Sequence, residues 1–438
     1  MSKTIQISAA LLLSWPVALP AQETPVAFTG ARVIRIEGPE IPDGIVIIQG
    51  GRIAAVGPAS LPVPGGARRI DVRGKVIMHG LIDTHSHIGG VEGADASAPI
   101  QPDVRVLDAL NVRDARIQKA QSGGITVANV MPGSGHLLSG QTLYLKLRDG
   151  RVIDDLLIRR DDGAIAGGLK LANGTNSRRP PPFPGTRAKS AALVREQFIK
   201  AQEYQEKVRQ AAGDAAKLPL RDLRMEALAE ALSGKRIVHF HTHRHDDILT
   251  VLRLASEFGF RVVLQHVSDA WLVAGEIARA GVLGASLILI DSPGGKIEAK
   301  DNRLQSAVAL EQAGGTVGFH TDDGVTDSRW FLRMAALAVR AGMSRDKALY
   351  AMTMAGAIML DLGDRTGSLA VGKDADLVVL SGDPLSVYTK VEQTWVDGQK
   401  VFDRSDPKDR LYAVGGYGAS HDQGGGIVDE EEDLGGQN

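Results

Sequence analysis

The chain has 438 residues, which is enough for one large α/β domain with a smaller satellite domain. Hydrophobic residues make up 43% and charged residues 23%, a globular composition that excludes a largely disordered chain and a multi-span membrane protein. Lys and Arg (50) and Asp and Glu (52) are well mixed and the net charge is -2, so we expect no nucleic acid or anionic membrane as a partner. Because there is no cysteine, a bound metal would need histidine, carboxylate or modified lysine ligands.

The first 21 residues have the features of a secretory signal peptide. Lys3 makes the start basic, residues 9–13 are apolar, and Ala21 is a small residue suited to cleavage. Pro16 and Pro20 argue against a β-strand, and the apolar run is too short to span a membrane comfortably. We therefore expect cleavage near Ala21, export to the periplasm or the exterior, and no membrane span in the mature protein.

Short β-branched runs occupy both ends of the remaining chain. Between residues 22 and 75 they alternate with turns, and no helix intervenes. The same pattern of short β-branched runs and turns recurs between residues 366 and 418, for example in Asp376–Leu380. Two sequence-distant β segments that flank an α/β region predict one small β-sandwich built from both chain ends. The tail, residues 419–438, is rich in Gly and acidic residues and is expected to be disordered.

The segment between them, residues 76–365, alternates helical periods with short apolar runs, which is typical of parallel βα repeats. The fold class predicted is α/β, a TIM-like (β/α)8 barrel with the small β-sandwich beside it. Only seven strands can be assigned from the sequence, and residues 142–158 look like a hairpin. The expected helices are 104–122, 188–212, 221–232, 246–258, 269–280, 303–313, 328–341 and 345–359, and the expected strands are 76–84, 126–131, 164–171, 236–241, 261–265, 284–289 and 316–319.

Two histidines, His85 and His87, close the apolar strand that begins near Val76. Residues two apart in a strand face the same way, so both imidazoles should meet at one mouth of the barrel. Barrel enzymes keep their active sites at that mouth. A lone histidine would more often be a packed or surface residue, but a His-x-His pair with Asp83 nearby favours a metal site.

Three further apolar runs end in histidine or aspartate. Residues 238–246 contain four histidines, among them His241, while His266 follows residues 261–265 and Asp322 follows residues 316–319. Each one alone could cap a helix or bond to backbone. Four strand ends that each deliver histidine or aspartate indicate a shared metal centre.

Together these pieces resemble the amidohydrolase superfamily. They are the segment 80–87, Gly-Leu-Ile-Asp-Thr-His-Ser-His, the later His241, His266 and Asp322, and the segment 367–380, which in this superfamily marks the return of the chain from barrel to sandwich. Within it, the chain is similar to the imidazolonepropionase-like and Xaa-Pro dipeptidase-like branch. The resemblance covers residues 26–418 and implies a metal-dependent hydrolase.

The resemblance also implies roles for individual residues. His85 and His87 would bind one metal ion, His241 and His266 the second, and Asp322 would bind metal and handle the proton. We expect two zinc ions, although another divalent metal would suit the same ligands. An aspartate at this position can take a proton as water attacks a carbonyl and return it to the leaving group.

Lys170, in Gly168–Ala172, falls where related enzymes place a carboxylated lysine that bridges two metals. Relatives carry Gly-Glu-Asn shortly after this lysine, but this chain has Gly174-Thr175-Asn176, so one metal and two metals both stay open. We expect no other acidic residue near that strand end except Asp161 and Asp162, which precede the strand and should lie at the opposite rim. We expect Lys170 to be carboxylated.

Two further residues are candidates for orienting substrate: His136, in a Gly-rich loop, and Arg244. The expected reaction is hydrolysis of an amide C–N bond in a small molecule or dipeptide. The alternative is a cyclic amidohydrolase or lactonase acting on a ring amide or ester, because the metal core does not choose among carbonyl substrates. A weaker alternative, a non-catalytic scaffold, is disfavoured because every metal-ligand position is kept. A homo-oligomer is left open.

Overall fold

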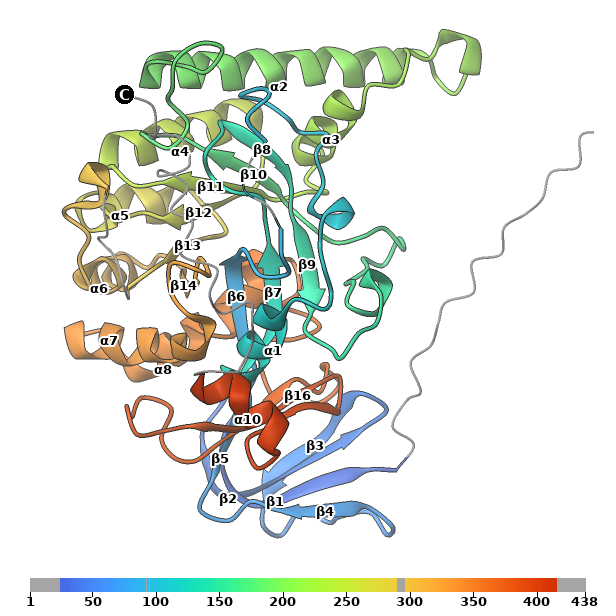
Figure 1. Cartoon of the computed structure of the whole chain (residues 1–438), viewed down its shortest axis with the longest axis vertical. Coiled ribbons are helices and arrows are strands. Elements are labelled where there is room, and N and C mark those ends of the chain that lie inside the picture. The colour runs from blue at the N-terminus through green and yellow to red at the C-terminus, as the bar shows by residue number, and fades with distance from the viewer. Residues whose placement is uncertain (1–23, 92, 94, 290–295, 416–438) are drawn as a thin grey trace, which may run out of the picture.

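A computed structural model describes residues 24–91, 93, 95–289 and 296–415 of the chain (Figure 1). The expected signal peptide and the expected disordered tail lie outside these residues. Within the part of the chain that the structure describes, no helix has the length and apolar character that crossing a membrane requires.

Both chain ends contribute strands to one eight-stranded sheet, seen below the barrel in Figure 1. The strand order is β17-β16-β15-β5-β1-β2-β3, with β4 paired to β1. The antiparallel pairing of β5 with β15 joins the two ends, and the rings of Phe28 and Trp395 meet edge to face in its core at 5.1 Å. The expected two-layer sandwich stays a prediction. The strands are β1 (Val26–Ile34), β2 (Ile41–Gln49), β3 (Arg52–Pro58), β4 (Arg68–Asp71), β5 (Val76–His79), β15 (Leu377–Leu380), β16 (Val391–Val396) and β17 (Gln399–Asp403).

The middle of the chain forms a TIM-barrel-like fold. Strands β10 to β14 run parallel, and β6 is parallel to β7. Two consecutive strands, β8 and β9, run antiparallel to their neighbours and join the two groups, because β9 pairs with β7 and β8 with β10. The strands are β6 (Leu81–Ser86), β7 (Ile125–Val130), β8 (Leu138–Gln141), β9 (Leu143–Lys146), β10 (Leu169–Ala172), β11 (Val238–Thr242), β12 (Val262–His266), β13 (Gly284–Leu287) and β14 (Val317–Phe319).

Backbone hydrogen bonds link the segment after β14 back to β6. The amide of Asp322 donates to the carbonyl of His85 at 2.9 Å, and the amide of His87 donates to the carbonyl of Asp323 at 3.1 Å. The barrel is thus closed beside the His-x-His pair, so the first and last strands deliver their polar ends to one place.

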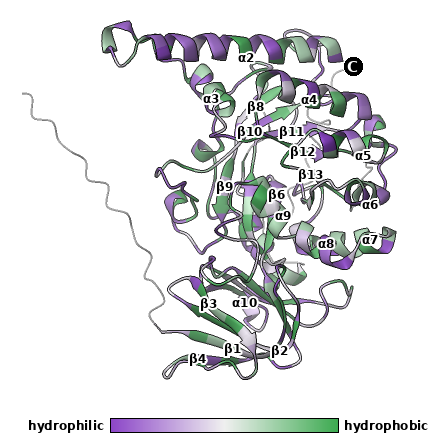
Figure 2. Cartoon of the chain, turned by 180° about the vertical axis from the view of Figure 1, so that it is seen from behind, coloured by the Kyte–Doolittle hydropathy of each residue, from purple (hydrophilic) through white to green (hydrophobic). Residues whose placement is uncertain are grey.

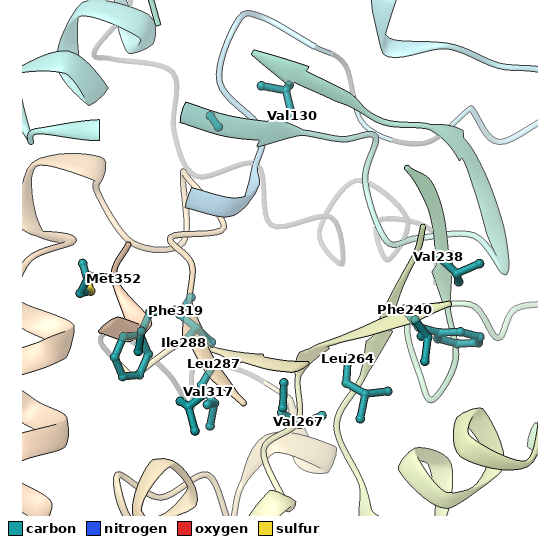
Figure 3. Packing of buried hydrophobic residues seen from close by; sticks show 14 of the residues in the cluster. Val130, Val238, Phe240, Leu264, Val267, Leu287, Ile288, Val317, Phe319 and Met352 are labelled. Atoms are coloured by element: carbon teal, nitrogen blue, oxygen red, sulfur yellow. The ribbon is translucent and has the colours of Figure 1, made fainter. Parts of the chain in front are cut away.

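Helices cover the outer side of the barrel strands (Figures 1 and 2). Figure 3 shows Phe240 and Leu264 on this outer side, where they belong to the same apolar core as Val251 and Leu254 of α4. Helix α2 is mostly hydrophilic in Figure 2, and accordingly only four of its residues are buried. The helices are α1 (Ala115–Ser122), α2 (Arg187–Gln210), α3 (Leu223–Leu232), α4 (His245–Phe258), α5 (Ala270–Arg279), α6 (Gln305–Gln312), α7 (Arg333–Ala341), α8 (Arg345–Ala351), α9 (Met354–Met359) and α10 (Pro407–Val414).

Some expected element boundaries are wrong. The helix expected over 104–122 is a short 3-10 turn, Val106–Asp108, followed by α1, which starts late because the Asp114 side chain caps it by accepting from the amide of Arg116 at 2.8 Å. The helix expected over 345–359 is broken into α8 and α9 at Thr353, whose φ of -137° is not helical. The strand expected from Ala164 begins only at Leu169.

Candidate metal centre

The ends of β6, β10 and β14 bring four of the expected site residues together. The Nε2 atoms of His85 and His87 lie 3.3 Å and 2.9 Å from Oδ1 of Asp322. The Nζ atom of Lys170 lies 2.9 Å from Nε2 of His85. His85 and Lys170 are fully buried, so the cluster lies at the bottom of the barrel mouth. One nitrogen or oxygen from each of His85, His87 and Asp322 falls within 4.8 Å of the others.

The remaining expected ligands, His241 and His266, lie next to this cluster. Their ring centroids are 4.2 Å apart, and the rings of His85 and His266 are 4.9 Å apart. Nδ1 of His266 also lies 4.0 Å from Oδ2 of Asp322. All six expected metal-binding residues therefore lie in one region, and their roles as ligands stay a prediction.

His266 reaches the site through an unusual backbone conformation. Its neighbours Val262 and Leu264 are part of the apolar core that the helices cover, so strict alternation would turn residue 266 outward as well. Instead, His266 has a φ of 70° and Val267 a φ of 42°, both in the left-handed region that side chains disfavour. Such strain often occurs at functional sites. Here it turns the imidazole into the barrel mouth.

Four buried histidines of the site are neutral at pH 7. Burial lowers the pKa of His85, His241 and His266 well below its ordinary value, and neighbouring histidines and the Lys170 ammonium lower it further. Burial likewise lowers the pKa of His320 to about 3. Neutral imidazole is the form that binds metal, so these side chains need no deprotonation at neutral pH before they coordinate.

The carboxyl group of Asp322 is ionised, because the effects that lower its pKa outweigh its burial. Burial alone would raise the pKa of its carboxyl group, but the hydrogen bond with His87 and nearby positive charges lower the pKa further than burial raises it. Asp322 also has a φ of 51°, another left-handed residue beside the site. Asp83 supports this loop from below, since its Oδ1 accepts from the amide of Thr321 at 3.1 Å and from the amide of His85 at 3.2 Å.

The two expected substrate-binding residues differ in their surroundings. His136 is buried, and its ring meets that of Phe183 edge to face at 5.0 Å. Arg244 pairs instead with Asp246 at 2.8 Å, and 40% of its side chain is exposed. Within the described part of the chain, no hydrogen bond or ion pair joins Arg244 to the metal cluster, so its role in binding substrate stays a prediction.

Two histidines of the centre and one acid near the end of β10 were missed. His320 lies with Nε2 3.2 Å from Nδ1 of His266, and His243 packs against His241 with ring centroids 4.6 Å apart. At the end of each strand, alternation places this histidine on the face opposite to the apolar core residues. The alternating pattern could therefore have revealed both histidines. Glu298 was not foreseeable, because it comes from a distant loop and accepts from the amide of Thr175 at 2.8 Å. The expectation that no acid other than Asp161 and Asp162 lies near the end of β10 is therefore wrong.

The donor set fits divalent metal ions. Among the described residues, both ring nitrogens of His241 and the Nε2 atoms of His243 and His266 are buried without a hydrogen-bond partner. Buried polar atoms are almost always satisfied, so such a cluster of imidazole nitrogens suits the binding of a cation. Imidazole nitrogens and a carboxylate are the ligands of catalytic zinc sites. His85, His87, His241, His266 and Asp322 each belong to a group that could hold such an ion, and Lys170 would join them as a ligand only if it were carboxylated.

The barrel and this donor set define a metal-dependent hydrolase. The model of the amidohydrolase family matches residues 114–402, well over half of the chain, and the chain belongs to this family. Its members hydrolyse carbon–nitrogen bonds with the help of metal ions, so the chain is an enzyme of that class.

Two curated proteins and one solved structure illustrate the relationship. Amidohydrolase tasK of Hapsidospora irregularis is 30% identical over 82% of this chain, which spans only 40% of that protein's length. An imidazolonepropionase of Sphingopyxis alaskensis is 25% identical over 85% of this chain and 97% of its own. The crystal structure of an amidohydrolase from Thermotoga maritima MSB8 has a TM-score of 0.80 and 32% identity, covering 86% of this chain and all of that one.

Proposed function

We propose that this enzyme hydrolyses an amide C–N bond in a small molecule or dipeptide, using two divalent cations, most simply zinc, held at the centre described above. The observation that carries the proposal is the set of buried, unpartnered imidazole nitrogens beside an ionised Asp322. Zinc, when bound, makes water acidic enough to supply hydroxide near neutral pH and polarises a carbonyl group.

The protein's own groups would handle the proton. Asp322 is ionised and can therefore accept a proton at a carboxylate oxygen and pass it to the leaving nitrogen. His87 holds that carboxylate in place, because its Nε2 lies 2.9 Å from Oδ1, while its Nδ1 lies 2.8 Å from the carbonyl oxygen of Met131. His85 is fully buried, whereas 17% of the Asp322 side chain is exposed, so a substrate can reach the carboxylate.

A substrate that carries a carboxylate suits the electrostatics best. Lys296 forms no ion pair among the described residues. Burial lowers the pKa of His243 to about 3, and the next largest cause is the positive charge of Lys296, so that charge acts on the site. Glu298, two residues further on, fixes the loop to the rim through Thr175. An N-acyl amino acid or a dipeptide would place its carboxylate near this cation.

The alternative substrate is a ring amide or ring ester. The imidazolonepropionase relative is named for a compound that has both a ring amide and a carboxylate, and the latter would also suit Lys296. A non-catalytic scaffold is the weaker alternative, because the chain keeps both the ligands and the ionised aspartate.

A hydrolysis screen of the full chain, first stripped of metal and then loaded with zinc, tests the proposal. N-acyl amino acids, Xaa-Pro dipeptides, ring amides and lactones would be compared, with the stripped protein as control. We expect zinc-dependent release of an amine from at least one acyclic amide. Zinc-dependent opening of only the lactones would favour the alternative, and no zinc dependence with any substrate would contradict the proposed function.

We also propose that the enzyme acts after export. The support is the basic start, short apolar segment and small residue at Ala21. N-terminal sequencing of the mature protein from its native host tests this: a start near Gln22 is expected, and an intact Met1 would contradict it.

A further inference from the structure

We infer that His243 is a metal ligand, so that the second ion of the proposed centre is held by three histidines, His241, His243 and His266. The inference rests on the proposed metal centre, and it adds a ligand that the superfamily resemblance did not supply. It follows from the packing of the three rings and from the hydrogen bonds that each ring makes and lacks.

The three rings form one compact group. His241 and His243 are two apart at the end of β11, so their side chains face the same way, as His85 and His87 do. Ring centroids are 4.6 Å apart for His241 and His243 and 5.0 Å apart for His243 and His266. One ring nitrogen from each of the three residues lies within 4.8 Å of the others.

The hydrogen bonds of His243 fit a ligand whose outer nitrogen is fixed. Its Nδ1 lies 2.8 Å from the hydroxyl oxygen of Ser268, and its Nε2 is buried with no partner among the described residues. His266 has the same arrangement, with Nδ1 3.2 Å from Nε2 of His320 and its own Nε2 unpartnered. Metal-binding histidines almost always have the nitrogen that does not touch the metal fixed in this way.

His239 shows what a purely structural histidine of the same strand looks like. Its Nε2 lies 2.8 Å from the hydroxyl of Tyr144, and its Nδ1 lies 3.2 Å from the side-chain amide of Gln265. Both ring nitrogens are satisfied inside the protein. His243 is also buried but keeps one nitrogen unsatisfied, which is unfavourable unless a ligand occupies it.

Three neutral imidazoles are a sufficient donor set for a zinc ion that keeps an open position. The second ion would therefore not depend on a bridging carboxylated lysine to be held. Lys170 could still bridge, and His243 would add a ligand in a chain that has Thr175 where relatives have a glutamate.

Zinc titration of the metal-stripped full chain, with X-ray absorption to count imidazole ligands, tests the inference. His243→Ala should weaken binding of one of the two ions and remove one imidazole from the average count. His245→Ala is the matched control, since His245 is the next histidine in the run, is 49% exposed and pairs with Asp269. It should bind both ions as the unsubstituted chain does.

Ser268→Ala provides a second variant that keeps all ligands. It should weaken the same ion by about 10–100-fold, the range for loss of a group that orients a metal ligand, and less than His243→Ala does. Circular dichroism of each variant checks folding. If His243→Ala and Ser268→Ala bind zinc like His245→Ala, the inference is overturned while the metal centre stands. If the unsubstituted chain binds no divalent ion, both are overturned.

Discussion

Oδ1 of Asp322 lies 2.9 Å from Nε2 of His87 and 3.3 Å from Nε2 of His85. Nδ1 of His87 lies 2.8 Å from the carbonyl oxygen of Met131 and donates to it, so Nε2 is the nitrogen that faces the carboxylate. Burial raises the pKa of the Asp322 carboxyl group, but the hydrogen bond and the positive charge of His87 lower that pKa. A divalent cation could replace the shared proton, because one atom each of His85, His87 and Asp322 lies within 4.8 Å of the others.

Asp322→Asn should reduce kcat by at least about 100-fold, because the amide keeps the shape of the side chain but cannot accept a proton. The measurement is steady-state kinetics on the best substrate of the screen, with metal content determined in parallel. A rise in KM alone, at unchanged kcat, would show that Asp322 binds substrate and does not move the proton.

Lys170→Ala should lower both activity and metal content, since we propose that Lys170 is carboxylated and that its oxygens bridge the two ions. An ammonium group 2.9 Å from His85 would repel a cation, whereas a carbamate would attract one. Mass spectrometry of the native protein should find one added carbon dioxide. Short carboxylic acids should restore part of the activity and bicarbonate should not. Normal turnover with two bound ions in Lys170→Ala would contradict the bridging role.

Lys296→Met should raise KM about 10-fold for substrates that bear a carboxylate and leave KM for the matching uncharged amides nearly unchanged. The reason is the loss of a cation that acts on the site and has no carboxylate partner among the described residues. Lys300→Met is the control, because Lys300 is exposed and lies 3.9 Å from Asp301. Equal effects of Lys296→Met on charged and uncharged substrates would rule out carboxylate recognition.

Much of the site could be predicted because strand periodicity and side-chain chemistry act locally. The spacing of His85 and His87 was enough to place both on one face, and the same rule covers His241 and His243. It does not cover His266, which alternation would turn toward the helices and which reaches the centre only through a φ of 70°. A backbone conformation of this kind is imposed by tertiary packing and leaves no mark on the sequence pattern.

The rest of the fold was harder for related reasons. Strands β8 and β9 lie between β7 and β10 in the barrel and run antiparallel to them. A hairpin-like sequence pattern does not reveal which neighbouring strands the two will pair with. Glu298 approaches Thr175 across 123 positions of the chain, so only the closed barrel brings the two together. Long-range pairings of this kind depend on the whole topology and not on any local run of residues.

Asp383 should make the stability of the protein fall in acid. Burial raises the pKa of its carboxyl group, but hydrogen bonds from Arg345 and Arg32 outweigh burial and lower the pKa to about 2 from 3.8. A lowered pKa in the folded state means that the stabilisation is fully present above about pH 4 and is lost as the pH falls toward 2. Thermal unfolding of metal-stripped protein at pH 5 and pH 3 should show a smaller drop in Tm for Asp383→Asn than for the unsubstituted chain. Asp301→Asn, at an exposed site, should leave the drop unchanged.

Lys146→Met should destabilise the whole molecule by about 3–5 kcal/mol, the usual cost of leaving buried charge without its partner. Lys146 lies at the end of β9 and is buried, with Nζ 2.9 Å from Asp374 and 3.1 Å from Asp397 and a further hydrogen bond to Asp376. Burial lowers the pKa of Lys146, but these three carboxylates outweigh it and raise the pKa, so the side chain is a cation. The ammonium therefore joins the barrel to the sheet that both chain ends build.

A double variant, Lys146→Met combined with Asp376→Asn, separates the effect of lost charge from the effect of lost packing. Asp374 keeps Arg52 at 2.9 Å and Asp397 keeps Arg148 at 2.6 Å, so Asp376 is the carboxylate that depends most on Lys146. Urea unfolding should therefore show that the double variant recovers part of the stability lost in Lys146→Met. A single variant within about 1 kcal/mol of the unsubstituted chain would show that the cluster contributes little. A double variant no more stable than the single one would show that lost packing of the lysine stem, and not unpaired charge, causes the destabilisation.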